Sequence, residues 1–372
     1  MTRMKKILFY SEGWGLGGIE RFIMNTIESM DLTRYQFDIF CTHDWDSSYD
    51  EVIEDFGGHR YTVFPRSKPN LFTRLLASTS AWKRQLKCGS YDAVHINTMN
   101  GMGLVYAHIA KSCGVPIRIV HSHNSKYGSS HLPFKRLAHS LGKTLYQSDV
   151  TDRIACSIDA GTYLFGKLPF SVIRNGTNTD RFRFDSDIRN QTRKKLNLDD
   201  THFLFGSIGR LTSEKNPLFQ IRLLSAMKEK GVPAKLLLIG VGPLKKAIEH
   251  TAAELNLSSD VILKDTTTRP EYYLNALDAL TMPSFYEGLP MTIIEAFSCG
   301  LPCILSDGIP TIGVPLTYEK HISLADAPAW KDTLYNLYRS HDKRLNGSHF
   351  VKNAGYSSAT TTHILEQLYS RS

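Results

Sequence analysis

Two acidic side chains, Glu287 and Glu295, stand eight positions apart in the stretch Ser284–Pro302, which otherwise has the apolar composition of a buried core. Ionised carboxylates are rarely buried unless something pairs with them. Gly288 permits unusual backbone angles and Pro290 suits the first position of a helix, so we expect Glu287 in a loop and Glu295 about one turn inside the helix. The free N–H groups at such a helix start favour an anion. Two carboxylates beside a phosphate-sized anion suit the hydroxyl groups of a sugar or a ribose.

Two basic side chains, Arg210 and Lys215, lie in the stretch Gly206–Pro217, between an apolar segment that predicts a buried strand and the start of a predicted helix. Two cations at the carboxyl end of a strand are able to neutralise a diphosphate leaving group, Arg through its planar fork and Lys as a point charge. The alternative interpretation is a pair of exposed surface cations without a ligand.

Two segments of the N-terminal half also carry residue types that suit a ligand. Gly17 and Gly18 end a G-x-G-x-G-G run between the first predicted strand and the first predicted helix. This order differs from G-x-G-x-x-G, so alone it is weak evidence for a dinucleotide site, and packing is the alternative. His121 and His123 end another predicted strand, with no nearby acid or Cys pattern that would make them metal ligands, and a structural role is the alternative.

The spacing of the two glutamates, with "EGLP" opening the motif and "EA-x-x-x-G-x-P" closing it, resembles the signature of the retaining glycosyltransferases of family four, which have the GT-B fold. The resemblance covers nearly the whole chain. It implies that Glu295 holds the ribose of a nucleotide and that Glu287 contacts the donor sugar beside the reacting carbon. It further implies that the loop and helix start contact the donor phosphate or sugar. These residues are Gly288, Leu289, Pro290, Met291 and Thr292.

The same resemblance assigns roles to residues outside this motif. Arg210 and Lys215 match the family's diphosphate-binding GR-x-x-x-x-K pattern, and the turn at Gly17 and Gly18 is implied to face the donor phosphate and the acceptor. In the family a loop one strand before the glutamate motif contacts the base, and Thr266 is our candidate there.

The resemblance also implies that a His at the end of the strand predicted over residues 117–122 contacts the donor sugar or assists at the reaction centre. We prefer His123 because it lies just past the predicted strand, and His121 stays the alternative.

Short apolar strands alternate with amphipathic helices in both halves of the chain, which predicts an α/β protein with two doubly wound parallel sheets facing a cleft. The Asn-, Asp- and Arg-rich stretch Val172–Leu196 separates the halves. We therefore expect an acceptor-side domain over residues 1–180 and a nucleotide-sugar domain over residues 181–357, with a helix over residues 358–370 that packs back on the first. Ligands of such sheets bind at the carboxyl ends of strands. The first half is expected to contain helices over residues 19–30, 71–87, 101–112 and 132–147.

The composition is that of a globular protein in a reducing compartment. The chain has 372 residues, and its six cysteines are scattered without a CxxC pair. No apolar run reaches the roughly 20 residues of a membrane-spanning helix, and the start suits a first strand better than a signal peptide. We expect a cytoplasmic protein.

Basic residues are concentrated in one region. Between Gly57 and Ser148 there are thirteen Lys and Arg and one acid, Asp92. Basic residues between Phe, Leu and Trp, on the helices predicted within residues 60–87, suit an anionic membrane surface. They equally suit a polyanionic substrate or nucleic acid, or a solvated face without a partner. The "VHSHNS" block and this basic half resemble bacterial enzymes that build exopolysaccharide, capsule or O-antigen units on a polyprenyl-diphosphate lipid. That resemblance favours peripheral binding at an anionic membrane surface and no nucleic acid partner.

The sequence as a whole predicts a retaining glycosyltransferase that moves a sugar from a nucleotide-sugar, most simply a UDP-sugar, to a lipid-linked glycan acceptor. Two alternatives stay open: a GT-B epimerase that acts on the nucleotide-sugar itself, and a non-catalytic nucleotide-sugar-binding partner of a transferase. We expect no metal and no cofactor besides the nucleotide-sugar co-substrate. The acid pairs Asp44/Asp46 and Asp185/Asp187 have the DxD form of metal-binding glycosyltransferases, but we interpret both as loops.

Overall fold

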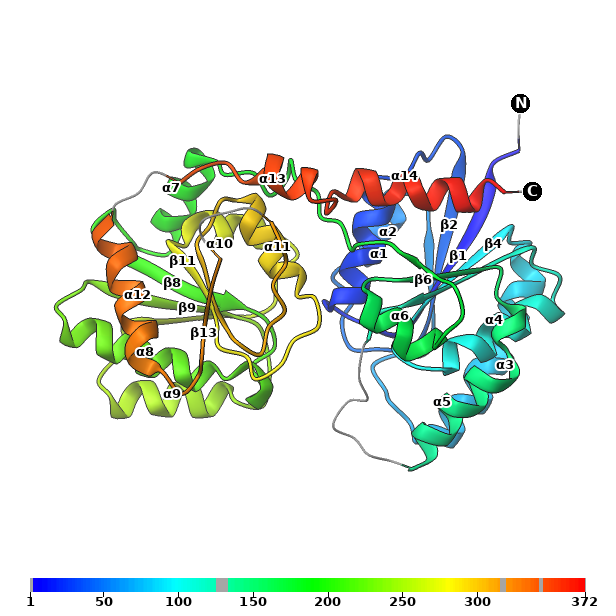
Figure 1. The fold of residues 1–372 in the computed structure, drawn as a ribbon, viewed down its shortest axis with the longest axis horizontal. Coiled ribbons are helices and arrows are strands. Elements are labelled where there is room, and N and C mark those ends of the chain that lie inside the picture. Colours follow the sequence, from blue (N-terminus) through cyan, green and yellow to red (C-terminus); the bar gives the residue numbers. More distant parts are fainter. Residues whose placement is uncertain (1–2, 125–132, 315–318, 341–343, 372) are drawn as a thin grey trace. The chain divides into compact units, whose positions relative to one another are not determined.

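The computed structural model describes residues 3–124, 133–314, 319–340 and 344–371. The chain divides into two compact units, which Figure 1 shows in sequence colours. Unit 1 contains Met1–Gly176 and Ser357–Ser372, and unit 2 contains Thr177–Tyr356. The sequence placed the domain boundary after residue 180, whereas the chain leaves unit 1 after residue 176. No helix of the described part is long and apolar enough to cross a membrane.

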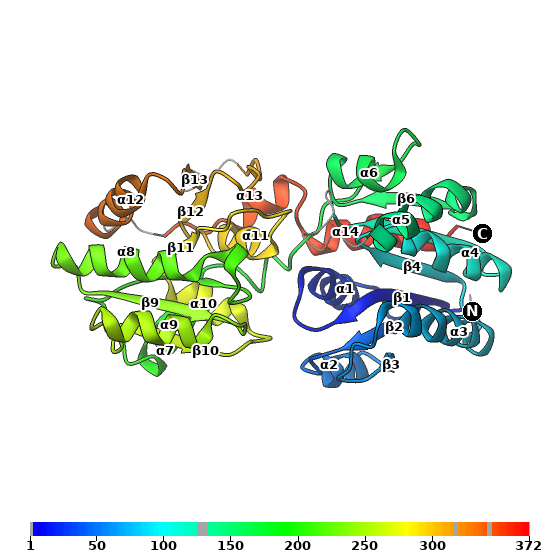
Figure 2. The ribbon, with the colours of Figure 1, turned by 90° about the horizontal axis from the view of Figure 1, so that it is seen from below.

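In its described part, unit 1 has a sheet of seven parallel strands in the order β3-β2-β1-β4-β5-β6-β7. Figure 2 labels β3, β2, β1, β4 and β6 of this sheet. The strands are β1 (Lys5–Trp14), β2 (Tyr35–Asp44), β3 (His59–Phe64), β4 (Ala93–Thr98), β5 (Ile117–Ser122), β6 (Asp152–Ala155) and β7 (Ser171–Val172). The helices are α1 (Gly18–Glu28), α2 (Asp50–Asp55), α3 (Leu71–Gly89), α4 (Met102–Ser112), α5 (Pro133–Leu145), the short 3₁₀ turn η1 (Gln147–Asp149), α6 (Ile158–Phe165) and α14 (Ser358–Tyr369).

Both faces of this sheet are covered by helices, which explains why the strands are apolar without alternation. Ile7 and Phe9 of β1 face α1, α2 and α14, whereas Leu8 and Tyr10 face α3, α4 and α6. Figure 1 shows α1, α2 and α14 on one side of the strands and α3 and α4 on the other. The terminal helix α14 is part of this core, because the hydroxyl of its Tyr369 lies 2.6 Å from His95 Nδ1 in β4.

In its described part, unit 2 has a sheet of six parallel strands in the order β10-β9-β8-β11-β12-β13. The strands are β8 (Phe203–Ile208), β9 (Ala234–Ile239), β10 (Val261–Lys264), β11 (Ala279–Met282), β12 (Cys303–Ser306) and β13 (Glu319–Ile322). The helices are α7 (Ser186–Lys195), the 3₁₀ turn η2 (Ser213–Lys215), α8 (Pro217–Glu229), α9 (Lys245–Glu254), α10 (Pro270–Ala276), α11 (Met291–Ser298), α12 (Ala327–Ser340) and α13 (Ser348–Asn353). Apolar residues of α10, α11 and α13 pack on one face of the sheet and those of α8, α9 and α12 on the other.

Two differences from the predicted elements bear on function. The basic stretch that begins at Arg60 was expected on helices, but its first residues form β3, an edge strand that is half exposed and therefore lacks a continuous apolar run. Strand β1 continues to Trp14, into the glycine-rich run that was expected to follow the first strand, because Gly13 and Trp14 still pair with β2. The helix expected to begin at Leu132 has its predicted start outside the described residues.

Candidate active site

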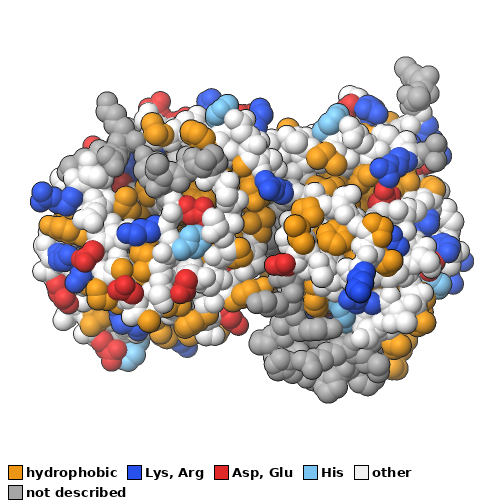
Figure 3. Space-filling view, in the orientation of Figure 1, with side chains coloured by type: hydrophobic (Ala, Val, Ile, Leu, Met, Phe, Trp, Pro, Cys, Tyr) orange, Lys and Arg blue, Asp and Glu red, His pale blue; other side chains and the backbone are white. Residues whose placement is uncertain are grey.

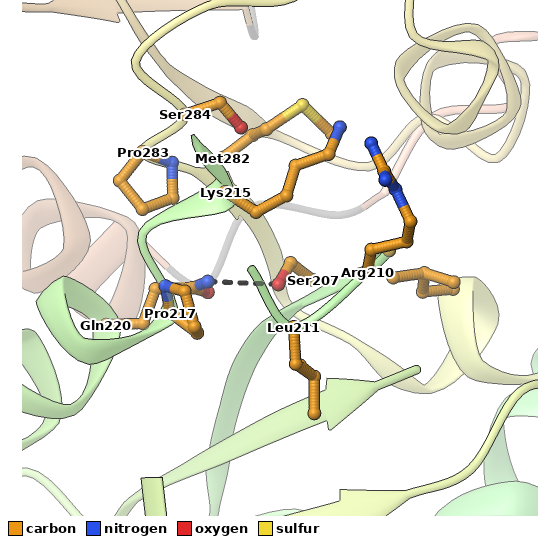
Figure 4. Close-up of a pocket in the computed structure, with 11 residues that line it drawn as sticks. Ser207, Arg210, Leu211, Lys215, Pro217, Gln220, Met282, Pro283 and Ser284 are labelled. Atoms are coloured by element: carbon orange, nitrogen blue, oxygen red, sulfur yellow. Dashed lines mark hydrogen bonds between the residues drawn. The ribbon is translucent and has the colours of Figure 1, made fainter. Parts of the chain in front are cut away.

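A pocket in unit 2 lies at the carboxyl ends of β8 and β11, the edge at which ligands bind to parallel sheets. Figure 4 shows the side chains of Arg210 and Lys215 at this pocket. The residues that line it are Ser207, Ile208, Gly209, Arg210, Leu211, Lys215, Pro217, Gln220, Met282, Pro283 and Ser284. The structure therefore brings the two predicted diphosphate-binding cations to one pocket.

The backbone holds both cations in place. Gly209 N–H and Leu211 N–H donate to the carbonyls of Ile239 and Val241 over 2.9 Å each, so the loop that carries Arg210 continues the β8–β9 ladder. Lys215 ends η2, and the next residue, Asn216, has a left-handed backbone (φ 53°) that leads into α8. A cation on a short, hydrogen-bonded loop is preorganised for an anionic ligand.

Lys215 forms an ion pair with Glu287 through Nζ and Oε1. The two residues are predicted to hold different parts of the donor, Lys215 its diphosphate and Glu287 its sugar. Their loops are also joined by the backbone, because Phe285 N–H donates to Glu214 O over 2.9 Å. The ion pair therefore couples the predicted diphosphate and sugar subsites.

The loop and helix start between these glutamates are built as the sequence predicts, with α11 beginning at Met291 and ending at Ser298. A side chain on Gly288 would meet nothing within 4 Å, so this residue lies in open space. Leu289 and Met291 pack against the apolar core, and Pro290 has no N–H. A ligand at this helix start would therefore meet backbone N–H groups, such as those of Met291 and Thr292, and not the apolar side chains.

Glu295 has the interior position predicted for it, about one turn inside α11, but 0% of its surface is exposed. The structure does not present this carboxylate at the pocket.

Thr266 lies in the loop that follows β10, where its side chain is exposed. It does not line the pocket of Arg210 and Lys215. The structure therefore gives no contact that supports Thr266 over its neighbours as a base-binding residue.

Sequence reasoning missed three polar residues of the pocket. Ser207 Oγ lies 3.0 Å from Gln220 Nε2, and Gln220 Oε1 in turn accepts from Thr281 Oγ1 over 2.7 Å. Ser284 lines the pocket, is fully buried, and its hydroxyl has no partner among the described residues. A buried hydroxyl without a partner is available to a ligand. The available signal was the position of Ser207 and Ser284 at or just past the ends of two adjacent strands.

The glycine-rich turn of unit 1 packs against an acidic side chain of the helix that follows it. Glu20 is the third residue of α1 and folds back over the helix start, so that a Cβ on Gly17 would clash with its carboxylate. This is the acidic half of a capping box. Burial raises the pKa of Glu20 to about 7, although the N–H groups of Glu20 and Gly17 act in the opposite direction. Gly17 is thus needed for close packing of Glu20, whereas Gly18 is open to its surroundings.

His123 follows β5 and is half-buried. Its Nε2 lies 2.9 Å from Asn97 Oδ1 and its Nδ1 lies 3.5 Å from Asn175 Nδ2. An amide oxygen only accepts and an amide nitrogen only donates, so this network places the proton on Nε2. Burial lowers the pKa of His123 to about 3. A neutral ring with both nitrogens engaged suits positioning, and not proton transfer.

His121, the alternative to His123, is fully buried in β5. Its Nδ1 lies 3.3 Å from His95 Nε2, which makes it part of the contact between the sheet and α14. Its Nε2 has no partner among the described residues. Of the two histidines, His123 is the one with exposed surface.

The acid pair at the end of β2 has a structural role. Asp44 forms an ion pair of 2.7 Å with Arg60 of β3, and it accepts from the backbone N–H of Arg66 over 2.7 Å. These contacts fix the edge of the sheet. Within the described ranges, no group of three His, Cys, Asp or Glu side chains is arranged to hold a metal ion.

The second acid pair, expected in a loop, lies at the start of a helix. Asp185 is the N-cap of α7, and its carboxylate accepts from the N–H groups of Asp187 and Ile188 over 2.9 and 3.0 Å. An acid at this position satisfies free N–H groups of the first turn. The DxD spacing here is thus the signature of a helix cap.

Comparison with known protein families agrees with this architecture. The family model described as Glycosyltransferase Family 4 matches residues 16–181, and the model described as Glycosyl transferases group 1 matches residues 188–332. HepE of Anabaena, in complex with UDP and glucose, superposes with a TM-score of 0.74 at 17% identity, over 99% of this chain and 100% of that chain. The fold and the two models define the class, a glycosyltransferase with the GT-B fold, and confirm the predicted fold.

Named relatives show to which glycosyltransferases this chain is similar. EpsF of Bacillus subtilis (strain 168), named as a glycosyltransferase, is 31% identical over 340 residues, which are 90% of this chain and 88% of that protein. A UDP-Gal:alpha-D-GlcNAc-diphosphoundecaprenol alpha-1,3-galactosyltransferase of Escherichia coli is 24% identical over 302 residues, 78% of this chain and 76% of that protein. The chain belongs to the family-four glycosyltransferases, as the glutamate motif predicts.

Proposed function

We propose that this glycosyltransferase moves a sugar, with retention at the anomeric carbon, from a UDP-sugar to a polyprenyl-diphosphate-linked glycan in the synthesis of a bacterial surface polysaccharide. The observation that carries the proposal is the pocket in unit 2, where Arg210 and Lys215 meet at the carboxyl ends of the strands and Lys215 pairs with Glu287. The Escherichia coli relative, named for a UDP-galactose donor and a diphosphoundecaprenol acceptor, supports both substrate classes. A relative from Salmonella typhi is named for Vi polysaccharide biosynthesis.

The cations of the pocket supply the charge that the reaction needs. As the bond between the sugar C1 and the diphosphate breaks, negative charge grows on the leaving group, and Arg210 and Lys215 stabilise it. The acceptor hydroxyl forms the new bond to C1 from the same face, and its proton passes to the diphosphate oxygen that leaves. These fixed cations do the work that a divalent metal does elsewhere, so we propose that no metal is required.

Glu287 acts on the sugar in this scheme. Its ion pair with Lys215 holds the carboxylate beside the diphosphate site, where it accepts hydrogen bonds from donor hydroxyls. Unit 1 provides the acceptor surface, and the neutral ring of His123, held by Asn97 and Asn175, contributes a fixed contact to the donor sugar.

A membrane surface is the proposed location of the acceptor. Helix α3 of unit 1 exposes Phe72 and Leu76, and Lys83, Arg84 and Lys87 are exposed along its second half. Apolar and basic side chains on one helix suit the interface of an anionic bilayer. Figure 3 shows more acidic side chains on the visible face of unit 2 than on that of unit 1. The contact that we propose is peripheral.

Part of the basic charge of unit 1 is paired with acids of the same unit and is not free to serve that surface. Arg60 pairs with Asp44 and Asp50, and Lys111 pairs with Asp149 at 2.6 Å. The count of thirteen basic residues therefore overstates the charge that is free to meet lipid.

The test is a donor panel. Thermal shift with UDP, GDP and their sugars should show stabilisation by UDP compounds, and release of UDP from the active donor should depend on a lipid-linked acceptor. Turnover should be unchanged by EDTA. Stabilisation by GDP compounds alone, loss of turnover with EDTA that Mg²⁺ restores, or conversion of a UDP-sugar without any acceptor would contradict the proposal, and the last result would indicate an epimerase.

A further inference from the structure

Trp45, which directly follows β2, is unlike the other three tryptophans of the chain. Trp14, Trp82 and Trp330 are fully buried, whereas 61% of Trp45 is exposed. A single exposed apolar side chain is common at a protein surface, but an indole offers an aromatic face on which a ligand can stack. Trp45 is therefore a candidate contact for a ligand.

The backbone below Trp45 is shaped to receive its ring. A Cβ on Gly13 or Gly15 would clash with the indole, so the ring lies against the end of β1 and the turn that follows. The first two glycines of the G-x-G-x-G-G run, Gly13 and Gly15, therefore leave room for the ring of Trp45. Gly17 leaves room for the side chain of Glu20 in the same way. A ring that is already fixed loses little entropy when a ligand stacks on it.

A buried polar group without a partner lies beside this ring. The rings of His43 and Trp45 have centroids 5.4 Å apart, and His43 Nε2 would lie 3.3 Å from a Cβ on Gly13. His43 is 2% exposed, its Nδ1 is 2.9 Å from Thr42 Oγ1, and its Nε2 has no partner among the described residues. Buried polar atoms are normally paired, so this nitrogen is available to a ligand group.

Charged groups complete the arrangement. Glu12 directly precedes Gly13 in β1 and pairs with Arg74 at 3.5 Å. Its side chain stays 35% exposed. Burial lowers the pKa of His43, and the charges of Lys68 and Arg74 lower it further against the opposing effect of Glu12 and Asp44. Burial and the nearby cations thus favour the neutral imidazole. Glu12 and Arg74 are close enough to His43 to affect its pKa. We call Glu12, His43, Trp45 and Arg74 the Trp45 platform.

We propose that the Trp45 platform binds a sugar ring of the glycan acceptor, an inference that rests on the proposed transferase function. The C–H face of a hexose would lie on the exposed indole, while Glu12 accepts from its hydroxyls. A flat aromatic surface with a few convergent polar groups is the usual composition of a small-molecule site. The platform lies at the carboxyl end of β1 and β2, the sheet edge at which ligands bind.

Trp45 offers its own signal for a test. Because the other tryptophans are buried, acrylamide should quench mainly Trp45 in the full-length protein. We expect that one or more of the methyl glycosides of glucose, galactose, N-acetylglucosamine and N-acetylgalactosamine protect it from quenching at millimolar concentration. Trp45→Phe should remove the quenchable signal, which would assign that signal to Trp45.

Kinetics give the second readout. Trp45→Ala should raise KM for a lipid-linked acceptor about tenfold, as expected from the loss of one aromatic contact of roughly 1.4 kcal/mol. UDP affinity should be unchanged. Ile158→Ala, which removes an equally exposed apolar side chain from α6 of unit 1, is the matched control and should leave both constants unchanged.

The outcomes separate this inference from the proposed function. If UDP does not bind the wild-type protein, the proposed function fails. If UDP binds but no sugar protects Trp45 and Trp45→Ala leaves KM unchanged, the platform is not an acceptor site. If anionic vesicles protect Trp45 and sugars do not, the residue contacts lipid and the inference is overturned.

Discussion

The candidate sites of the two units differ in the charge that their ionisable groups carry. In unit 2, Lys215 and Arg210 line a pocket, and Lys215 forms an ion pair with Glu287. In unit 1, burial lowers the pKa of His123 to about 3 and raises that of Glu20 to about 7, so that both groups are held toward their neutral forms. The pocket of unit 2 therefore suits an anion, whereas the edge of unit 1 suits neutral hydroxyl groups.

This contrast agrees with different roles for the two units in sugar transfer. The leaving diphosphate is the most charged part of the reaction, and charged groups that are fixed before the reaction stabilise it at little cost in reorganisation. An acceptor sugar is neutral, and the indole and imidazole rings of the Trp45 platform would contact it without a desolvated charge, while Glu12 stays partly exposed. The following experiments test each half of the comparison, beginning with the largest expected effect.

Substitution of Glu287 should affect turnover most. Glu287→Ala is expected to reduce kcat about a thousandfold, because a carboxylate that holds the donor sugar beside its reacting carbon acts mainly in the transition state. UDP should bind at least as tightly as to the wild-type protein, since Lys215 loses its carboxylate partner and keeps its charge for the diphosphate. Single-turnover kinetics and UDP calorimetry measure the two effects. A variant with wild-type turnover would show that the carboxylate does not contact the sugar.

Removal of either cation should weaken UDP binding. Arg210→Ala or Lys215→Ala is expected to lower UDP affinity about 10–100-fold, the usual worth of a charged hydrogen bond, roughly 1.5–3 kcal/mol. The double variant Lys215→Ala/Glu287→Ala should show non-additive effects, because the two residues interact directly. Lys245→Ala is the matched control, since Lys245 is an exposed cation of unit 2 that pairs with Asp265 at 3.2 Å. Unchanged affinity in both single variants would refute the diphosphate assignment.

These predictions depend partly on features that sequence reasoning identified and partly on features that it did not. The central strands were predictable because both faces of each sheet are buried and the strands read as apolar runs. The edge strand β3 was not, since it is half exposed. The motif around α11 was predictable because Gly288 and Pro290 mark a helix start locally.

Contacts between residues far apart in the chain could not be predicted from the sequence. Lys215 and Glu287 are 72 positions apart, and only the folding of two loops at adjacent strand ends makes them partners. The position of Trp45 over Gly13 and Gly15 depends in the same way on the pairing of β1 with β2. Glu20 carried a local signal that was missed, because an acid at the third position of a helix is the mark of a capping box.

Glu20 offers a test of the neutral half of the comparison. Its pKa is raised from 4.5 to about 7, so the folded protein holds a proton that the unfolded chain releases above pH 4.5. Its contribution to stability is therefore fully present below about pH 4.5 and is lost as pH rises through about 7. Glu20→Gln, which resembles the protonated form, should make unit 1 more stable than the wild type at pH 8, by on the order of 2 kcal/mol, with no gain at pH 4.5.

Chemical denaturation of both proteins across this pH range measures the difference. Burial lowers the pKa values of His95 and His123, so these histidines also make stability depend on pH, but they are present in both proteins and cancel in the comparison. The control acid is Asp31 of unit 1, which is exposed and whose pKa is lowered by hydrogen bonds from Thr33. Asp31→Asn should give no stability gain at pH 8. An equal gain from both substitutions would show that the effect comes from net charge and not from the burial of Glu20.

The smallest expected effect concerns the membrane surface of unit 1. Phe72→Glu and Leu76→Glu each replace an exposed apolar side chain of α3 with an acid, which removes buried area and adds repulsion from anionic lipid. Each is expected to reduce binding to vesicles that contain phosphatidylglycerol about tenfold, or roughly 1.4 kcal/mol. Co-sedimentation with vesicles measures the effect.

The two units should respond differently to this charge reversal. Leu255→Glu places the same charge at an exposed apolar position of unit 2 and should leave vesicle binding unchanged, because the proposed lipid contact lies on α3 alone. Turnover on a short, water-soluble acceptor analogue should stay at the wild-type level in all three variants, since none of these residues lines the pocket of unit 2. Equal losses of vesicle binding from Leu255→Glu and Phe72→Glu would mean that lipid senses the net charge of the protein. The exposed apolar residues of α3 would then have no specific part in binding, and the charge asymmetry of the sequence would be the whole of the effect.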